Sequence, residues 1–295
     1  MSSTRDRALL AAFVTNVFLA GGSGIAIRFS NRELAPLWGA CLRFGLAAAL
    51  LAIVMAGLRV SIPRGRALTG ALLYGLFQFA GAFGLYYYAL VRLHAGLGQT
   101  LFALAPLATL LFAVVQGQER LRKSAIVGTL LGLAGIGLIS LDQSQTAIPL
   151  MSLLAVLGSV LCFAQASVLA RRFSSIHPVA MNGVGMMVGA VVLLGGSTLL
   201  GEPHVLPQRA TTWVALGYVS VLGSVVVFLL YVFMLHHWTA SRAAYVMVLI
   251  PFVTVLLSAW LDNEQLSIRL LLGGLLVLTG VYIGALRQPR AALDP

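Results

Sequence analysis

Two stretches of this sequence resemble each other, and together they decide the fold. Residues 94–140 read HAGLGQTLFALAPLATLLFAVVQGQERLRKSAIVGTLLGLAGIGLIS, and residues 239–285 read TASRAAYVMVLIPFVTVLLSAWLDNEQLSIRLLLGGLLVLTGVYIGA. They align without a gap at a constant shift of 145 residues, with 12 identities in 47 positions. The identities include one proline, one glutamate and two glycines, which a bias towards leucine does not explain. A repeat of fixed period predicts two copies of one structural unit.

The composition around these stretches requires lipid as the solvent. Of the 295 residues, 60% are hydrophobic and 9% are charged, whereas soluble domains carry about 25% charged residues. The 31 glycines suit close helix packing in a membrane. The net charge of +11 is not arranged as the basic stripe with exposed aromatic residues that nucleic-acid binding uses. We therefore expect membrane lipid around the protein and no nucleic-acid partner.

Ten apolar stretches are long enough, at about 20 residues each, to cross the bilayer as helices. They lie near residues 7–28, 35–57, 67–90, 94–115, 123–141, 147–170, 177–200, 210–235, 239–260 and 266–286. Short connections make successive helices antiparallel neighbours and leave no room for a soluble domain. We expect an all-α integral membrane protein with two five-helix repeats, over residues 1–144 and 145–295.

Because each repeat has an odd number of helices, the second repeat enters the membrane from the side opposite to the first. The two repeats are then inverted and related by a pseudo-twofold axis in the membrane plane. Inverted repeats let one chain open alternately to either side, with a substrate site near the midplane where the halves meet. This architecture predicts a secondary transporter that works by alternating access.

The basic residues predict the orientation of the chain in the membrane. If the N-terminus is cytoplasmic, the cytoplasmic loops and tails carry 13 basic residues and the external loops carry 5. Arg43 lies inside a predicted helix and is not counted. The bias predicts a multi-pass protein of the bacterial inner membrane with both termini in the cytoplasm, and we expect the first helix to be retained rather than cleaved as a signal peptide.

The repeated pattern resembles a known family. The first copy has Pro106, then Glu119-Arg120-Leu121, then Gly128 to Gly135, and the second has Pro251, Glu264-Gln265-Leu266 and Gly273 to Gly280. Both copies resemble the EamA repeat of the drug/metabolite transporter superfamily, and Arg43-Phe44 resembles the Arg-Phe of its second helix. The whole sequence looks most like the YddG-type bacterial exporters of aromatic and other neutral amino acids. The resemblance implies a cavity surrounded by helices 1, 3, 4, 6, 8 and 9.

The acidic residues all fall in predicted loops or tails. They are Asp6, Glu33, Glu119, Asp142, Glu202, Asp262, Glu264 and Asp294. Proton-coupled carriers of cations commonly use a carboxylate in mid-membrane, where burial raises its pKa. This pattern disfavours cation antiport and favours facilitated diffusion or exchange of a net-neutral substrate. Glu119 and Glu264 are expected to cap the helices that directly follow them.

Arg43 is the one charged residue inside a predicted span. It has two interpretations: its aliphatic stem extends so that the charge reaches the external interface, or its guanidinium pairs with a substrate carboxylate. Transport of a phosphate ester would require several converging cations. A phosphorylated substrate is therefore disfavoured.

Polar and aromatic residues inside the helices are the candidate substrate-binding groups, because they are costly in lipid and tend to face a cavity or a partner helix. The candidates are Tyr74, Gln78, Phe79, Gln99, Phe102, Ser159, Phe163, Gln165 and Tyr245. Amides would bind the amino and carboxyl groups, and aromatic rings would enclose an apolar side chain. The alternative for each is packing between helices or a place in the interfacial aromatic belt. Tyr86, Tyr87 and Tyr88 point three ways, so at most two of them line a vestibule.

Prolines and glycines predict which helices move. Pro106 and Pro251 each remove a backbone hydrogen bond in a membrane helix and are candidate hinges, the alternative being a static kink. Glycines spaced by four residues on helices 5 and 10, at Gly128/Gly132 and Gly280/Gly284, predict a close and static contact.

Motifs of other protein classes are weak. Gly21-Gly22-Ser23-Gly24 contains the Gly-x-Ser-Gly of rhomboid proteases, but the five histidines map to loops and helix ends. The two cysteines, Cys41 and Cys162, lie in apolar segments, and we expect no metal, no cofactor and no enzymatic activity. We expect a monomeric exporter of neutral amino acids, aromatic and bulky apolar ones above all, with Thr and Met as further candidates. The alternative is efflux of another small neutral metabolite or drug.

Overall fold

The computed structural model describes residues 4–91, 102, 104–140, 150–251, 253 and 268–286. Its helices, in chain order, are α1 (Thr4–Ser30), α2 (Pro36–Gly57), α3 (Arg66–Gly75), η1 (Leu76–Ala82), α4 (Phe83–Leu90), α6 (Ala105–Val115), α7 (Lys123–Ser140), α8 (Leu150–Arg172), α9 (Pro178–Leu199), α10 (Ala210–Ser220), η2 (Val221–Val226), α11 (Val227–His237), α12 (Ala240–Ala243), α14 (Ile268–Val281) and η3 (Tyr282–Leu286). The three η elements are π-helices that continue their neighbours, so the described helices lie in ten stretches that match the ten predicted spans. The predicted all-α architecture is confirmed.

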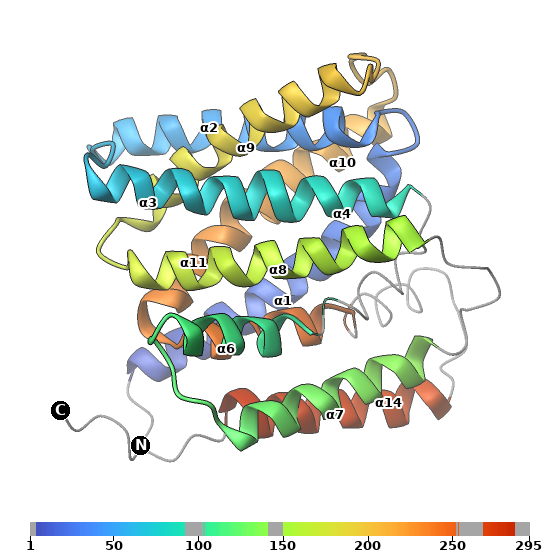
Figure 1. The fold of residues 1–295 in the computed structure, drawn as a ribbon. Coiled ribbons are helices and arrows are strands. Elements are labelled where there is room, and N and C mark those ends of the chain that lie inside the picture. The colour runs from blue at the N-terminus through green and yellow to red at the C-terminus, as the bar shows by residue number, and fades with distance from the viewer. Residues whose placement is uncertain are drawn as a thin grey trace.

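The helices form one bundle of roughly antiparallel rods (Figure 1). Five of the described helical stretches are long and apolar enough to cross a membrane. The outer faces carry large apolar side chains such as Leu199, which is 89% exposed, and Val214, which is 73% exposed. Apolar surface of this extent is stable only against lipid, because soluble monomers rarely expose contiguous apolar patches of this kind.

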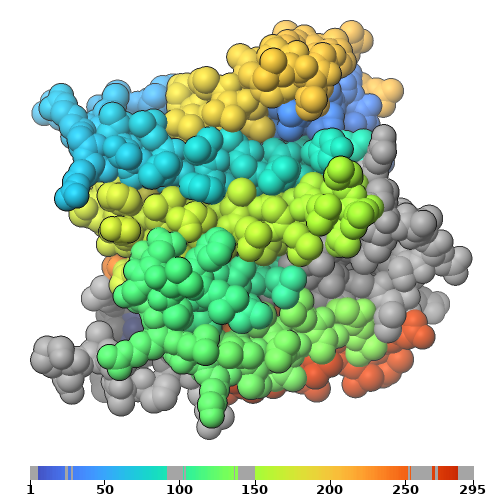
Figure 2. Space-filling model, viewed as in Figure 1, coloured from blue at the N-terminus to red at the C-terminus, as the bar shows by residue number. Residues whose placement is uncertain are grey.

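Two helix pairs form the opposite edges of the bundle. α2 packs along α9, and α7 packs along α14, with α1, α3, α4, α6, α8 and α11 between them (Figure 1). Figure 2 shows the surface of the same view, where α8 and α6 lie across the middle. Counted as the ten successive helices of the chain, α2 and α9 are helices 2 and 7, and α7 and α14 are helices 5 and 10. In the same count α3–η1–α4 is helix 3, α8 is helix 6, α10–η2–α11 is helix 8 and the helix that begins with α12 is helix 9. Helices 2 and 7 are equivalent in the two repeats, as are helices 5 and 10. The edges therefore each join one helix of the first repeat to its counterpart in the second.

Glycines bring α7 and α14 into contact, as the sequence predicts. A Cβ atom at Gly128 would lie 2.6 Å from the carbonyl oxygen of Gly280 and 2.7 Å from Cα of Gly284. A Cβ atom at Gly280 would lie 2.5 Å from the carbonyl oxygen of Gly128. The two backbones thus approach too closely for any larger residue, and this contact predicted between the repeats is confirmed.

Two of the three π-helical segments follow the repeat. η1 begins at Leu76 and η2 begins at Val221, which is the same shift of 145 residues. A π-helical turn breaks the regular hydrogen-bond ladder and is frequent at functional sites. The internal symmetry therefore extends to the third helix of each repeat, beyond the stretches in which the sequence revealed it.

Carboxylates at the helix ends bind the N-termini of distant helices. Glu202 accepts hydrogen bonds from the backbone N–H groups of Leu37 (3.2 Å) and Trp38 (2.9 Å) at the start of α2. Glu33 does the same for Gln208 (2.9 Å) before α10, and its hydrogen bonds to Thr212 and to this backbone lower the pKa of its carboxyl group. Each carboxylate complements the positive end of a helix dipole.

Glu119 belongs to the same set, and the expectation that it caps the next helix is wrong. Its carboxylate accepts from the backbone N–H of Ser241 (3.0 Å) and from the Ser241 hydroxyl, so it binds the start of α12 in the second repeat. Arg122 Nη2 lies 3.5 Å from Glu119 Oε2. The chain folds back here because α6 and α12 pack against each other. Glu264 lies outside the described residues.

Candidate functional site

A cavity of about 120 Å³ lies inside the bundle between the two repeats. Its lining comes from α1, α2, the continuous helix α3–η1–α4, the start of the fourth helix, α8, the continuous helix η2–α11, and the ninth helix. The lining residues are Asn16, Ala20, Ser23, Ile27, Arg43, Gln78, Ala82, Phe83, Tyr86, Leu90, Phe102, Phe163, Gly223, Val227, Phe228, Tyr231, Met247, Ile250 and Pro251. Helices 1, 3, 4, 6, 8 and 9 contribute, as the family resemblance implies, and helix 2 adds Arg43.

The lining of the cavity follows the internal repeat. Five pairs of its lining residues are equivalent at the shift of 145 residues, and they come from both repeats. The pairs are Gln78 and Gly223, Ala82 and Val227, Phe83 and Phe228, Tyr86 and Tyr231, and Phe102 and Met247. The site is thus where the two halves meet, the place that inverted-repeat transporters use for their substrate.

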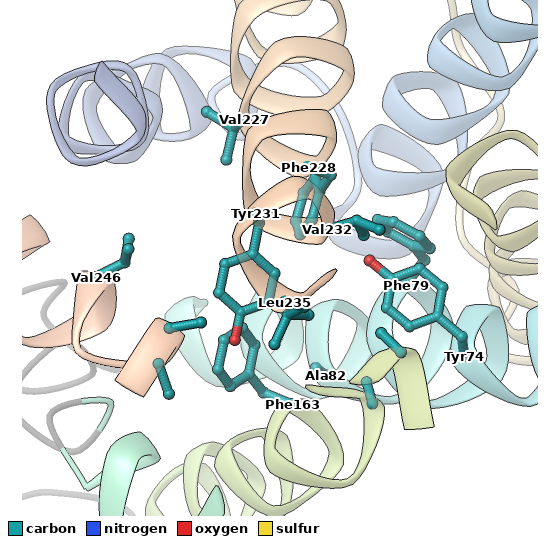
Figure 3. Close-up of a cluster of buried hydrophobic side chains, with 14 of the residues drawn as sticks. Tyr74, Phe79, Ala82, Phe163, Val227, Phe228, Tyr231, Val232, Leu235 and Val246 are labelled. Atoms are coloured by element: carbon teal, nitrogen blue, oxygen red, sulfur yellow. The ribbon is translucent and has the colours of Figure 1, made fainter. Parts of the chain in front are cut away.

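Aromatic rings form a continuous wall of this cavity. The ring of Tyr86 lies 5.0 Å from that of Phe102, Phe102 lies 6.1 Å from Phe163, and Phe163 lies 5.5 Å from Tyr231, between ring centroids. Figure 3 shows Phe163 of α8 and Tyr231 of α11 facing each other. Phe83 and Phe228 are 5.7 Å apart. These edge-to-face and tilted contacts favour an apolar, flat or bulky guest.

The polar groups of the cavity gather around the π-helical part of helix 8. Arg43 donates from Nε to Ser224 Oγ (2.7 Å) and from Nη2 to the carbonyl of Gly223 (2.8 Å). Asn16 Nδ2 donates to the carbonyl of Val227 (2.6 Å). These bonds satisfy carbonyl groups that the irregular helix leaves in the apolar interior, where each unsatisfied group is costly.

Three of the nine predicted binding residues line the cavity: Gln78, Phe102 and Phe163. Gln78 is fully buried, and neither its Nε2 nor its Oε1 has a hydrogen-bond partner. The candidate hinge Pro251 also lines the cavity.

Five predicted residues lie outside the lining, in contacts between helices. Tyr74 donates to Asn182 Oδ1 of α9 (3.2 Å), and Phe79 packs between Phe44 (5.0 Å) and Phe228 (4.9 Å), as Figure 3 shows in part. Ser159 donates to the carbonyl of Ala82. These residues pack between helices, which is the alternative to substrate binding that the sequence left open.

The other two residues of this group point away from the cavity towards other helices. Tyr245 donates to the carbonyl of Ala125 on α7 (2.7 Å), and Gln165 accepts from Gln116 Nε2 (2.9 Å). Helix 9 instead presents Met247, Ile250 and Pro251 to the cavity, on its adjacent face. Gln99 lies outside the described residues.

Sequence reasoning missed several lining residues that the repeat contains. Extended to the third and eighth helices, the shift of 145 residues pairs Phe83 with Phe228 and Tyr86 with Tyr231, identical in type. These four residues line the cavity. Of the tyrosine triplet, Tyr86 faces the cavity, Tyr87 is buried near Arg43 (3.4 Å from Nη1 to its hydroxyl) and Tyr88 is 50% exposed. The expectation that the triplet points three ways is confirmed.

The interpretation of Arg43 as a side chain that reaches the interface is wrong. Arg43 is 1% exposed, and its guanidinium lies 5.0 Å from the ring of Phe44 and 4.9 Å from that of Phe83. Its hydrogen bonds to Ser224 and Gly223 hold it across the bundle rather than along α2. The positive charge therefore lies at the cavity.

The hinge prolines and the serine motif have clear positions. Pro106 lies in the first turn of α6, directly after the turn at Leu104, and Pro251 lies where the described part of helix 9 ends. Ser23 donates back to the carbonyl of Leu19 (3.2 Å), and the lining residues that the structure describes include no histidine. Whether the prolines bend during transport stays a prediction.

This arrangement of two repeats around a largely apolar cavity with a few polar groups is that of a membrane transporter. The EamA-like transporter family matches residues 7–141 and again residues 150–285, which is nearly the whole chain in two copies. The chain therefore belongs to the EamA-like transporter family and is a membrane transporter rather than an enzyme.

Individual relatives agree with this assignment. The chain is 28% identical over 261 residues to the uncharacterized inner membrane transporter YedA of Escherichia coli strain K12, covering 88% of this chain and 84% of YedA. It is 27% identical over 278 residues to the uncharacterized transporter YyaM of Bacillus subtilis, covering 89% of each. A protein of known crystal structure has the same fold, with a TM-score of 0.81 at 21% identity over 95% of this chain and 97% of that one.

Proposed function

We propose that this protein exports neutral amino acids, aromatic and bulky apolar ones above all, across the bacterial inner membrane. The observation that carries the proposal is the cavity, which combines a wall of aromatic rings with a small set of unpaired polar groups. Binding sites for small molecules have this composition, because apolar surface supplies affinity and a few polar groups set the orientation. An amino acid with an apolar side chain presents both kinds of group.

The size of the cavity favours a small solute. Its volume of about 120 Å³ is below the roughly 300–1,000 Å³ of pockets for drug-sized ligands. Another small neutral metabolite remains the second candidate, because the aromatic wall alone does not require an amino group. A large drug fits this cavity less well than either.

Contacts at one end of the bundle support alternating access. At the N-terminal end, where α1 begins, Arg171 Nη1 donates to the carbonyls of Leu235 (2.9 Å) and His236 (2.8 Å) on α11. Glu119 binds Ser241 at the same end, and Gln116 binds Gln165. The cavity lining instead continues towards the opposite end, to Ile27 and Leu90. In this proposal the contacts at the N-terminal end must break so that substrate can enter the cavity from that side of the membrane.

The side of the membrane follows from the sequence and from a relative. The bias of 13 basic residues against 5 supports a cytoplasmic N-terminal end, and YedA is an inner membrane transporter by name. The closed N-terminal end is then cytoplasmic, and the cavity reaches towards the outside. A site of this kind that empties outward is suited to export.

Counterflow tests the proposal. Purified protein in liposomes preloaded with unlabelled amino acid should take up labelled phenylalanine, leucine or methionine faster than empty liposomes do. Cells that take up a dipeptide and hydrolyse it accumulate its two amino acids. Expression of the protein in such cells should raise the release of these amino acids into the medium. If no amino acid shows counterflow and a different small metabolite is exchanged, the amino-acid proposal is wrong and the protein exports another neutral metabolite.

A further inference from the structure

Arg43 brings a positive charge into the interior of the protein, and it has no negative partner among the residues that the structure describes. Its side chain is 1% exposed, and no described carboxylate forms an ion pair with it. The described glutamates Glu33, Glu119 and Glu202 are engaged at helix ends instead. An unpaired charge in an apolar interior is strongly unfavourable. Arg43 is therefore retained at a cost in stability, which indicates a function for its charge.

The neighbours of Arg43 orient its guanidinium and leave part of it free. Three hydrogen bonds, to Ser224 Oγ, to the Gly223 carbonyl and to the Tyr87 hydroxyl, use three N–H groups. A guanidinium has five N–H donors, so two remain for a ligand. Because Arg43 lines the cavity, a ligand bound there reaches these donors.

Gly223 provides the space in which this arrangement exists. A Cβ atom at residue 223 would lie 2.5 Å from Ser23 Oγ and 3.6 Å from Arg43 Nη2. Glycine at this position thus lets Ser23 of α1 approach helix 8 closely, while Arg43 would stay in ordinary contact with a larger residue. The equivalent position in the first repeat carries Gln78, so the two repeats contribute different chemistry to one site.

Two further groups of the cavity lack partners. Gln78 has neither amide atom hydrogen-bonded, and Asn16 has an unpaired Oδ1 while its Nδ2 is bonded. Both residues are fully buried. Buried polar groups without partners are rare and call for an explanation such as a ligand. Gln78 Nε2 is available to donate to an anion, and the oxygens of Asn16 and Gln78 are available to accept from an ammonium group.

We propose that Arg43 binds the carboxylate of the transported molecule and that the cavity thereby selects α-amino acids over the corresponding amides and amines. This proposal rests on the transport function proposed above and names the group by which the substrate is recognised. The carboxylate pairs with Arg43, the ammonium group faces Asn16 Oδ1 and Gln78 Oε1, and the apolar side chain lies against the wall from Tyr86 to Tyr231. The zwitterion has no net charge, but it supplies the anion that Arg43 lacks.

The first experiment uses the wild-type protein and is independent of transport. Thermal unfolding of the purified protein in detergent is measured with phenylalanine, 3-phenylpropionate, phenylalaninamide and phenethylamine. The two carboxylates are expected to raise the melting temperature, and the two compounds without a carboxylate are not. Equal stabilisation by the acid and its amide, or no stabilisation by either carboxylate, overturns the proposal.

The second experiment removes the charge. In Arg43→Gln the stabilisation by both carboxylates is expected to disappear, and half-maximal counterflow of phenylalanine should require roughly 10-fold to 100-fold more substrate, because hydrogen bonds to charged groups contribute this much. Arg43→Lys keeps the charge and should retain part of the preference. Arg32→Gln, which changes an exposed arginine in a loop, is the matched control and should behave as wild type.

The two proposals fail differently. If no amino acid shows counterflow but carboxylates stabilise the wild type and not Arg43→Gln, the export function is wrong and the carboxylate site stands. If phenylalanine shows counterflow and Arg43→Gln keeps the wild-type preference for the acid over the amide, the export function stands and the role of Arg43 is wrong.

Discussion

At the scale of single residues, Gln78 shows how a binding site differs from a packed interior. Leaving a buried polar group without a partner costs about 1–3 kcal/mol, and both amide atoms of Gln78 are in this state. The buried Tyr74, one turn earlier on the same helix, has a partner in Asn182. Of these two residues, Gln78 contacts the cavity and has no hydrogen bond in the protein, whereas Tyr74 lies outside the lining and has one.

Gln78→Leu should therefore separate stability from transport. Leucine removes two unsatisfied groups with little change in volume, so we expect the free energy of unfolding to rise by about 1 kcal/mol. Substrate exchange should fall, because the ligand loses an amide partner. Thermal unfolding and counterflow on the same preparation measure the two effects.

Gln165→Leu is the matched control for this change. Gln165 is outside the cavity lining and accepts from Gln116, so its replacement should lower stability rather than raise it. A Gln78→Leu protein with lower stability and wild-type exchange would contradict the assignment of Gln78 to the site.

At the scale of elements, the π-helical segment of helix 8 is the centre of the polar network. Side chains from three helices bind the carbonyls around it: Arg43 binds Gly223, Asn16 binds Val227 and Asn182 binds Phe228. Such carbonyls are tolerated in a membrane only where protein groups satisfy them. The irregular turn thereby fixes how α1, α2 and α9 meet helix 8 and where Arg43 points.

The glycine contact between α7 and α14 predicts a position-dependent effect of alanine. Gly128→Ala places a methyl group against the backbone of Gly280 and Gly284 and should destabilise the protein by about 1–3 kcal/mol. A Cβ atom at Gly137 meets no atom within 4 Å, so Gly137→Ala should be neutral or should stabilise the helix by about 0.5–1 kcal/mol. Thermal unfolding in detergent measures both variants, and equal effects would argue against the close contact.

At the scale of the whole molecule, the polar contacts at the N-terminal end predict a gate. Cysteines at Gln116 and Gln165, whose side chains are hydrogen-bonded at 2.9 Å, link α6 to α8 when oxidised or cross-linked. In a background without Cys41 and Cys162, cross-linking should abolish most of the exchange, because the end can no longer open. Reduction should restore it.

Controls for the gate are the two single-cysteine variants under the same oxidant. They should keep their exchange rates. Full exchange by the cross-linked protein would show that transport does not require this end to separate, and the alternating-access proposal would then need another gate.

The placement of acidic residues predicts how transport responds to pH. The described carboxylates Asp6, Glu33, Glu119 and Glu202 lie at helix ends, and the described residues of the cavity lining include no acidic residue or histidine. A pH gradient imposed on liposomes is therefore expected not to drive accumulation of substrate against its own gradient. Accumulation of labelled phenylalanine driven by the pH gradient alone would show that a proton-carrying group exists.

The sequence by itself determined the fold, the number of helices and the meeting of the repeats. These features follow from composition, helix length and the shift of 145 residues, which are properties of the chain read in order. The close contact of Gly128 with helix 10 was also predictable, because small residues spaced by four leave few other solutions in lipid. The boundary between residues 144 and 145 stays a prediction.

Only the tertiary structure decided which polar residues face the cavity and which hold the helices together. Gln78 and Tyr74 share one helix face, yet one is unpaired at the cavity and the other bonds Asn182. Glu119 binds Ser241, 122 residues later in the chain, and Arg43 crosses to helix 8 instead of reaching the interface. Spacing along one helix gives the direction of a side chain, but its partner depends on how distant helices pack, which a local pattern does not contain.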